Sequence, residues 1–232
     1  MQTNQLIMRL AADCSAVRRL SAPWQRTMLW VMISLLCVAA VMRITERNVI
    51  ESIDIRTAVE QAAILLTGVT AALAAFSTAV PGRDWRISLL PLIPLSVWLG
   101  SLGEGCVHDW WRLGADGLEL RSDWGCVPAA LVLSIPCATT MVVMLRRGAP
   151  LFPNLSLALG ALASTAMVNV ALRLFHAGDV AVMVLVWHFG GIVAVTTLAG
   201  WFGDRVLNWH SKGASRVFRN RRPERGSRKP AL

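Results

Sequence analysis

Sequence motifs of catalysis and of transport are missing from this chain. Its five cysteines form no C-x-x-C pair, which a quinone-linked thiol oxidoreductase would need. No nucleophile–base motif, Gly-rich phosphate loop or HExxH sequence occurs. A transporter would show internal repeats or broken helices at matching positions, but Pro91, Pro94, Pro128 and Pro136 gather in two consecutive apolar runs with no counterpart elsewhere. We therefore expect neither an enzyme nor a transporter.

Charged residues are also scarce, at 16% of the 232 residues, whereas hydrophobic residues make up 55%. Ordinary soluble domains do not combine these values with a net charge of +9. About 20 apolar residues cross a bilayer core. Six runs approach or exceed that length, at residues 27–43, 58–80, 87–102, 127–145, 155–175 and 180–202. Pro91 and Pro94 make the third run uncertain as a straight helix.

The fold class that follows is an all-α polytopic membrane protein, a bundle of six transmembrane helices over residues 27–203. Little of the chain is left for a soluble domain. The first apolar run comes after 26 polar or mixed residues and lacks a clear small-residue cleavage site. It is therefore interpreted as a retained span rather than a cleaved signal peptide.

The positive charges predict the orientation in the membrane. With the N-terminus in the cytoplasm, 17 of the 23 lysine and arginine residues fall in inner segments and six in outer loops. Acidic residues show the opposite bias, with four inside and ten outside. Lysine and arginine are enriched in the cytoplasmic loops of membrane proteins. We therefore expect both termini in the cytoplasm.

Residues 1–26 form a cytoplasmic segment whose apolar residues have helical spacing. Leu6, Leu10, Cys14, Val17 and Ser21 share one helical face, and Pro23 makes continuation of the helix beyond residue 22 unfavourable. One interpretation is a helix on the lipid surface. The other is a docking helix that inserts its apolar face into a partner's groove.

Residues 204–232 form a basic tail, with nine positive charges against two negative ones. Its content of arginine, proline, glycine and serine is typical of disorder. The charge favours contact with anionic lipid. We expect no direct nucleic-acid binding, because neither a fold nor a stacking pattern accompanies the charge.

The outer loop 103–126 is the most elaborate connection in the sequence, and Cys106 and Cys126 flank its centre. A bond between them would close a loop of about 20 residues at the ends of consecutive spans, worth on the order of 3 kcal/mol. The pair is open to four interpretations: a structural disulfide, a redox switch, a soft-metal site or two inert thiols. His108 lies two residues from Cys106, and thiolate with imidazole suits copper(I) or zinc.

Other polar residues are candidates for supporting roles. His176, in the short turn before the sixth span, could complete a metal site with Cys106, His108 and Cys126, although a turn histidine is more often a cap. Asn169, Arg173 and His188 lie inside the last two spans, where polar groups are functional hypotheses. We interpret His188 as a neutral, hydrogen-bonded histidine. Cys37 and Cys137 are read as small buried apolar residues.

Several stretches together resemble the NrsF family, negative regulators of sigma F that are six-span anti-sigma factors of the bacterial inner membrane. They are residues 6–23, 71–83, 89–110, 122–128, 144–150 and 173–188. The resemblance implies that the N-terminal segment holds an extracytoplasmic-function sigma factor, through Leu6, Leu10, Asp13, Val17, Arg18, Arg19 and Leu20. It also implies that Cys106 and Cys126 take part in sensing metal or oxidative stress.

Two features depart from the family pattern. Cys14 and Ala16 stand where a proline is expected just before residues 17–20, which bears on the choice of sigma factor. The basic tail from His210 onward extends past the usual end. The alternative to the anti-sigma function is a membrane thiol-redox or soft-metal-binding protein without a sigma-factor partner. The sequence predicts no oligomeric state.

Overall fold

The computed structural model describes residues 3–12, 20–44, 55–80, 82, 84–114, 126–148, 150–175 and 181–207. Within these ranges the chain is helical apart from short turns, and contains no strand. The α-helices are α1 (Thr3–Ala12), α2 (Pro23–Ile44), α3 (Ile55–Ser77), α4 (Leu92–Leu113), α5 (Cys126–Gly148), α6 (Pro153–Phe175), α7 (Ala181–Met183) and α8 (Gly190–Leu207). A 3-10 helix, η1 (Trp85–Leu89), precedes α4, and a π-helical segment, η3 (Val184–Phe189), joins α7 to α8.

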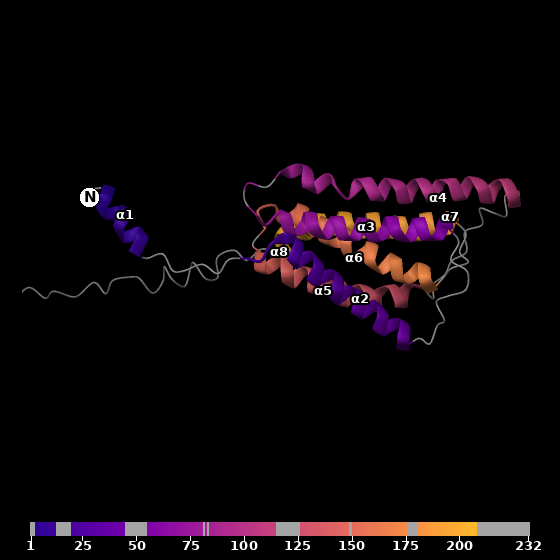
Figure 1. Cartoon of the computed structure of the whole chain (residues 1–232), viewed down its shortest axis with the longest axis horizontal. Coiled ribbons are helices and arrows are strands. Elements are labelled where there is room, and N and C mark those ends of the chain that lie inside the picture. The colour runs from indigo at the N-terminus through magenta and orange to yellow at the C-terminus, as the bar shows by residue number, and fades with distance from the viewer. Residues whose placement is uncertain are drawn as a thin grey trace, which may run out of the picture.

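Six of these segments are long and apolar enough to cross a membrane. They are Pro23–Val41, Ile55–Ser77, Trp85–Arg112, Ala130–Gly148, Pro153–Arg173 and Val184–Leu207. They form an elongated bundle, and α1 lies apart from it (Figure 1). The predicted all-α bundle of six apolar spans is therefore confirmed.

Proline marks the starts of the spans rather than their interiors. Pro23 and Pro153 are the first residues of α2 and α6, positions where the missing N–H costs nothing. Pro91 directly precedes α4, and Pro94 lies in its first turn. The third span is therefore a regular helix after a 3-10 turn, because both prolines fall where a helix tolerates them. Pro128 lies in the first turn of α5, and Pro136 lies in the interior of the same helix.

Helix α4 is longer than the apolar run that predicted it. The outer loop was expected to begin at residue 103, but the helix continues to Leu113. Cys106 and His108 therefore lie on a helix and not in a loop, which corrects that boundary. Intrahelical hydrogen bonds carry the backbone through this more polar stretch, so hydropathy alone underestimates the helix.

The N-terminal helix is shorter than its apolar spacing predicted. Helix α1 covers Thr3–Ala12, and residues 20–22 are not helical. Ser21, predicted on the same helical face as Leu6 and Leu10, is therefore not helical. Pro23 starts a new helix, and proline disfavours helical geometry in the residue before it, in accord with the non-helical residues 20–22. Residues 13–19, with most of the predicted docking positions, lie outside the described residues.

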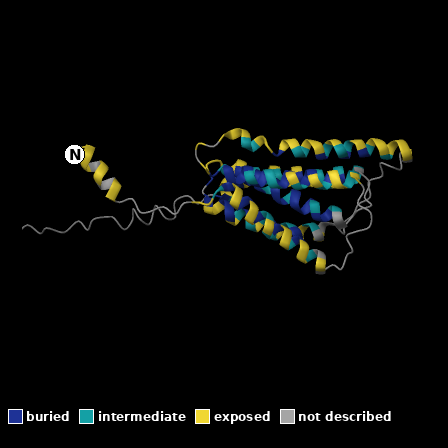
Figure 2. Ribbon diagram, viewed as in Figure 1, coloured by how far each residue is buried: buried dark blue, intermediate teal, exposed yellow. Residues whose placement is uncertain are grey.

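The core forms where α3 and α6 pack along each other. Small residues line the contact, and a Cβ added at Gly68 would lie 3.4 Å from the Ala163 carbonyl oxygen. Helix α4 packs on the outer side of α3, α8 packs on α6, and α5 packs on α2 and α6. Figure 2 shows the buried residues gathered between the helices, with exposed ones outside. Because many exposed side chains are large and apolar, such as Leu36 and Ile135, the outer surface suits lipid.

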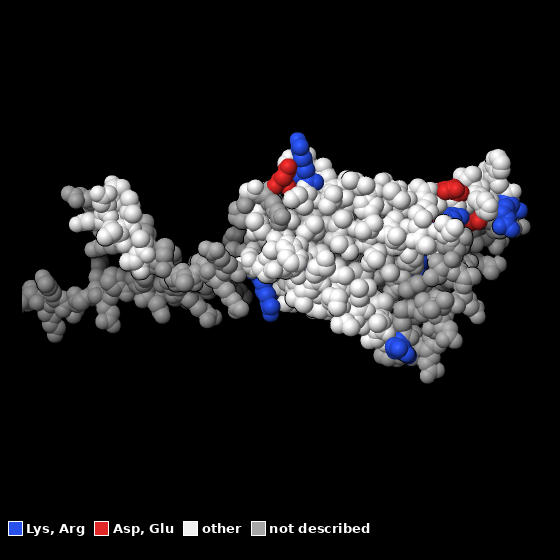
Figure 3. Space-filling model, viewed as in Figure 1, with Lys and Arg blue, Asp and Glu red and all other residues white. Residues whose placement is uncertain are grey.

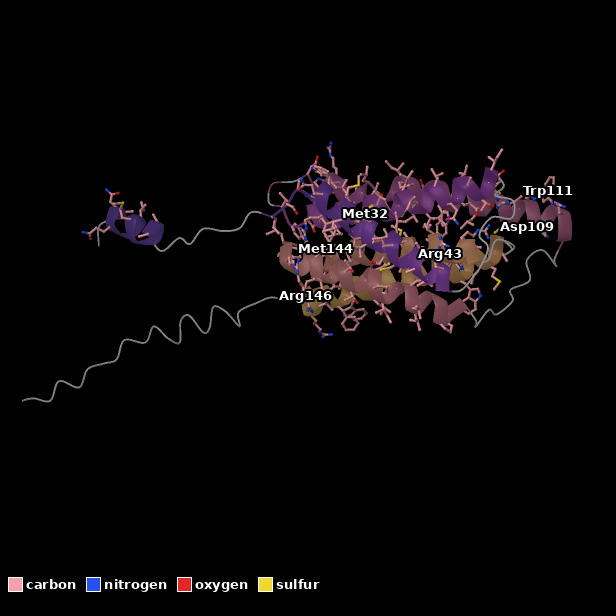
Figure 4. The ribbon with its side chains drawn as sticks, turned by 60° about the horizontal axis from the view of Figure 1, so that its bottom comes forward. Met32, Arg43, Asp109, Trp111, Met144 and Arg146 are labelled. Atoms are coloured by element: carbon pink, nitrogen blue, oxygen red, sulfur yellow. The ribbon has the colours of Figure 1, made fainter. Side chains whose placement is uncertain are left out.

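Charged side chains gather at the two ends of the bundle. Figure 3 shows a band without charge along the middle of this face, and arginine and acidic residues toward either end. Figure 4 labels Met144 and Arg146 at one end and Asp109 and Trp111 at the other. The end with Met144 and Arg146 is called the Arg26 end below, and the end with Asp109 and Trp111 the Glu60 end, each after the buried charged residue near it.

Candidate functional site

A buried ionic cluster joins three helices at the Glu60 end. The Glu60 side chain on α3 is 2% exposed. Its Oε1 accepts a hydrogen bond from Arg56 Nε at 3.2 Å, and its Oε2 accepts one from Arg173 Nη2 on α6 at 3.1 Å. A carboxylate buried in a membrane span is costly unless it is paired. The two arginines provide that pairing from opposite sides.

Helix α4 completes the cluster with backbone and small residues. Arg56 Nη2 donates a hydrogen bond to the Ser101 carbonyl oxygen at 3.1 Å. The Ser101 hydroxyl donates to Glu60 Oε1 at 3.5 Å. One turn further along α4, Gly105 lies directly against the Arg56 guanidinium, which occupies the space of a Cβ at that position. A larger residue at position 105 would require the end of the Arg56 side chain to move from this place.

The cluster borders a small polar cavity of about 10 Å³. Its walls include Asn169, Arg173 and His188, the three intramembrane residues singled out in the sequence, which the structure thus brings together. They face Glu60 and Gln61 across it. His188 lies in η3, and π-helical turns are frequent at functional sites.

Sequence reasoning missed Glu60 and Arg56. A signal was present, because Glu60 is an acid inside an otherwise apolar run, and ionisable residues within a span are functional hypotheses by default. Arg56 lies one turn before it, at the spacing of a helical ion pair. Only the tertiary structure adds Arg173, which lies 113 positions from Glu60 in the chain.

A larger cavity of about 240 Å³ lies between α5, α6 and the segment from η3 to α8. Asn169 and His188 line this cavity as well as the small one. The other lining residues are mostly apolar, among them Trp187. Such a cavity between bundle helices suits an apolar group.

Cys106 is the residue after Gly105 on α4, and its thiol is free and half-buried. Helix α5 begins at Cys126, whose side chain lies outside the described residues. The two helices follow each other in the chain, but they are not packed neighbours. Helix α4 packs on α3, α7 and η3, whereas α5 packs on α2 and α6, on the opposite side of the bundle (Figure 1). The expectation that a Cys106–Cys126 bond would close between neighbouring helices is therefore corrected.

The predicted metal ligands are only partly described. Cys106 and His108 are two residues apart on a helix, so their side chains do not face each other. His108 is exposed, with its Nδ1 3.9 Å from Asp109 Oδ1. Among the residues that the structure describes, no three metal-binding side chains come together. His176 lies outside those residues, and the metal site stays a prediction.

The Arg26 end uses neutral partners. Arg26 on α2 is 6% exposed, donates a hydrogen bond to the Met144 carbonyl oxygen, and lies 4.5 Å from the centre of the Phe76 ring. Gly148 lies against the same guanidinium, since a Cβ there would be 3.0 Å from Arg26 Nη1. Arg146 donates to the Val206 carbonyl oxygen at 2.7 Å, closing the end of α8.

Most of the N-terminal residues predicted to bind the sigma factor lie outside the described residues or have side chains that are not described. The side chains of Leu6 and Leu10 on α1 are not described, and Asp13, Val17, Arg18 and Arg19 fall in residues 13–19. The described side chains of α1, including Ile7 and Met8, are exposed.

Cys37 is half-buried and Cys137 is buried within their spans.

Six apolar spans with charges confined to the two ends define a multi-pass helical membrane protein. A family model, NrsF (Negative regulator of sigma F), matches residues 10–209. The chain therefore belongs to the NrsF family of negative regulators of sigma F, which confirms the resemblance seen in the sequence. No curated protein and no solved structure matches the chain.

Proposed function

We propose that the protein is an anti-sigma factor of the bacterial inner membrane that holds an extracytoplasmic-function sigma factor through residues 1–26. A redox signal at Cys106 and Cys126 on the periplasmic side releases the sigma factor. The observation that carries the proposal is the family match, which begins at residue 10 and so includes part of the N-terminal segment as well as all six spans. The protein acts by binding, without catalysis.

The charge distribution supports the orientation. Arg26, near the start of α2, donates a hydrogen bond to the Met144 carbonyl oxygen, and Arg146 and Arg147 follow Met144 at the same end of the bundle (Figure 4). Positive residues favour the cytoplasmic side. The Arg26 end is therefore assigned to the cytoplasm and the Glu60 end, with Cys106, to the periplasm, where thiols can be oxidised.

The redox step joins two helices that are apart at rest. Hydrogen peroxide takes two electrons and two protons from the thiols of Cys106 and Cys126 and becomes two waters, while one S–S bond forms and two S–H bonds break. The Cα atoms of a disulfide lie within about 7 Å. Because α4 and α5 lie on opposite sides of the bundle, the bond must draw their ends together.

For release, the bond must favour the releasing conformation over the holding one. Changing the bound fraction of the sigma factor from 99% to 1% requires about 5.5 kcal/mol of differential stability. A soft metal, copper or zinc, held by Cys106, Cys126 and His176 is the alternative signal. Helical geometry leaves His108 out of that set, since it does not face Cys106.

Retention of a sigma factor by the solubilised protein tests the proposal. We expect the full-length chain, but not a chain lacking residues 1–22, to co-purify with an extracytoplasmic-function sigma factor. Leu6→Asp together with Leu10→Asp should abolish retention. Met8→Asp together with Ala12→Asp adds the same charge to the opposite face of α1 and should leave retention intact.

Two results would contradict the proposal. Equal retention by the full-length and the truncated chain would show that the N-terminal segment is not the docking element. Absence of any sigma factor from both samples would favour a thiol-redox or metal-binding protein without that partner.

A further inference from the structure

Building on the function proposed above, we propose that Arg56, Glu60, Arg173 and Gly105 form a clamp that transmits a change at Cys106 to the helix bundle. The clamp joins α3, α4 and α6 at one point. When it is closed, α4 lies against α3. When α4 moves, the ion pairs of Glu60 are disturbed and the junction opens.

Steric fit is the first support for the clamp. The Arg56 guanidinium fills the place of a side chain at Gly105, so a Cβ there would force the guanidinium to move and give up its hydrogen bond to the Ser101 carbonyl oxygen. Gly103, on the same helix, has nothing within 4 Å of the corresponding position. The close approach is therefore specific to residue 105 and not a general feature of α4.

Charge is the second support. Glu60 is 2% exposed and Arg173 13% exposed, so water has little access to this pair, whereas Arg56 is 31% exposed. Removing one member of a buried ion pair leaves an uncompensated charge, and this makes the pair far more sensitive to displacement than surface pairs are. Small movements of α4 at Arg56 should therefore have large effects on the α3–α4–α6 junction.

The position of Cys106 is the third support. Cys106 follows Gly105 directly, and a helix moves its consecutive residues together. Trp98 and Leu102, buried on the side of α4 that carries Gly105, hold that side in the core. A bond from Cys106 to Cys126 pulls toward α5, on the far side of the bundle, and so draws Gly105 away from its place beside Arg56.

Helix α3 provides the connection to the other end. It carries Glu60 near its start and Phe76 near its end, and Arg26 of α2 lies 4.5 Å from the centre of the Phe76 ring. Residues 1–22 lead directly into α2. A shift of α3 at the clamp therefore reaches the segment that is proposed to hold the sigma factor.

The test is to disturb the clamp without touching the thiols. We expect Gly105→Ala to raise sigma-dependent transcription in unstressed cells about tenfold, the factor that corresponds to about 1.4 kcal/mol. The rise in transcription should persist when Cys106→Ser is combined with Gly105→Ala, because the added methyl group disturbs the clamp directly and does not need the thiol. Gly103→Ala, the matched control, should leave transcription at the wild-type level. Membrane abundance of each variant shows that the chain has folded.

A second measurement does not depend on any sigma factor. In membrane vesicles, Cys106 should react with a maleimide faster in Gly105→Ala than in Gly103→Ala, because an open clamp exposes the half-buried thiol; mass spectrometry locates the label. Arg56→Ala removes the group with which the methyl collides. Adding Gly105→Ala to Arg56→Ala should therefore change neither the labelling rate nor transcription further.

The outcomes separate the clamp from the function on which it builds. If Cys106→Ser abolishes the peroxide response while Gly105→Ala leaves unstressed transcription unchanged, the clamp is overturned and the sensor stands. Equal effects of Gly103→Ala and Gly105→Ala also overturn the clamp. If the full-length protein retains no sigma factor, the proposed function is contradicted. Faster labelling of Cys106 in Gly105→Ala would then show that the clamp exists but does not control a sigma factor, which overturns its role in transmission.

Discussion

Each end of the bundle places an arginine against a glycine, Arg26 buried at one end and Arg56 partly exposed at the other, but the two arginines have different partners. Arg26 lies against Gly148, a ring and a backbone carbonyl, all neutral partners. Arg56 lies against Gly105 and shares the carboxylate of Glu60 with Arg173. The contacts of Arg26 with neutral groups are called the neutral joint below, whereas Arg56 takes part in an ionic junction.

The difference teaches where a conformational change can start. At the Arg26 end, the hydrogen bond from the guanidinium to a carbonyl oxygen and the cation–π contact involve no counter-charge that a movement could remove. A buried carboxylate between two guanidinium groups is stable only while all three remain in place. A free thiol, that of Cys106, follows Gly105 in the sequence at that junction, whereas the sequence next to Gly148 contains no cysteine. The Glu60 end is therefore the sensitive one.

Removing the carboxylate should have the largest effect on stability. We expect Glu60→Gln to destabilise the protein by about 3–5 kcal/mol, because Arg173, which is 13% exposed, and the partly exposed Arg56 are left without their counter-charge. Thermal unfolding of the detergent-solubilised protein measures this. Glu104→Gln removes an exposed acid of α4 and serves as the control, with an expected change below about 0.5 kcal/mol. Equal losses in the two variants would contradict the ionic description of the Glu60 end.

Replacing the arginine of the neutral joint should cost less. Arg26→Met keeps an apolar stem but loses the contact with the Phe76 ring and the hydrogen bond to Met144, for about 2 kcal/mol. Arg43→Met, at the exposed end of α2, is the matched control. The same unfolding measurement applies. If Arg26→Met were as damaging as Glu60→Gln, the distinction between the two ends would disappear.

The glycine of the neutral joint should tolerate a methyl group better than Gly105 does. A Cβ at Gly148 would lie 3.0 Å from Arg26 Nη1, which is tight but needs only a small shift. We expect Gly148→Ala to lose at most about 1 kcal/mol, since part of the steric cost is offset by the lower backbone entropy of alanine. Gly100→Ala, in open space on α4, should be neutral or slightly stabilising. Unfolding midpoints of the two variants give the comparison.

The smallest effect on stability, and the sharpest on function, is expected at the thiols. Cys106→Ser should change stability by less than about 0.5 kcal/mol under reducing conditions, because the thiol is half-buried and unbonded. It should nevertheless abolish the transcriptional response to hydrogen peroxide. Cys37→Ser, at a half-buried thiol within α2, should leave that response unchanged. A preserved response in Cys106→Ser would exclude this thiol as the sensor.

Labelling also tests which side of the membrane the Glu60 end faces. A membrane-impermeant maleimide added to intact spheroplasts should modify Cys106, since the proposed orientation puts that end on the periplasmic side. Labelling that requires permeabilised membranes would reverse the assignment.

Much of the fold followed from composition and spacing. The six apolar spans were predicted because a bilayer requires runs of about 20 apolar residues whatever the packing. The helical N-terminal segment followed from the spacing of its apolar residues, and the family from the stretches that resemble it. Boundaries were less accurate. Helix α4 continues to Leu113 because backbone hydrogen bonds extend a helix through polar residues that a hydropathy window excludes.

The sequence by itself determined the elements of this protein, since apolar length, proline position and charge bias act locally along the chain. It also named Asn169, Arg173 and His188 as polar residues within spans. Only the tertiary structure decided that Arg173 pairs with Glu60, that Gly105 receives the Arg56 guanidinium, and that the helices bearing Cys106 and Cys126 are not neighbours. These contacts depend on which helices pack together, and helix order in space is set by side-chain fit between distant segments rather than by any local pattern.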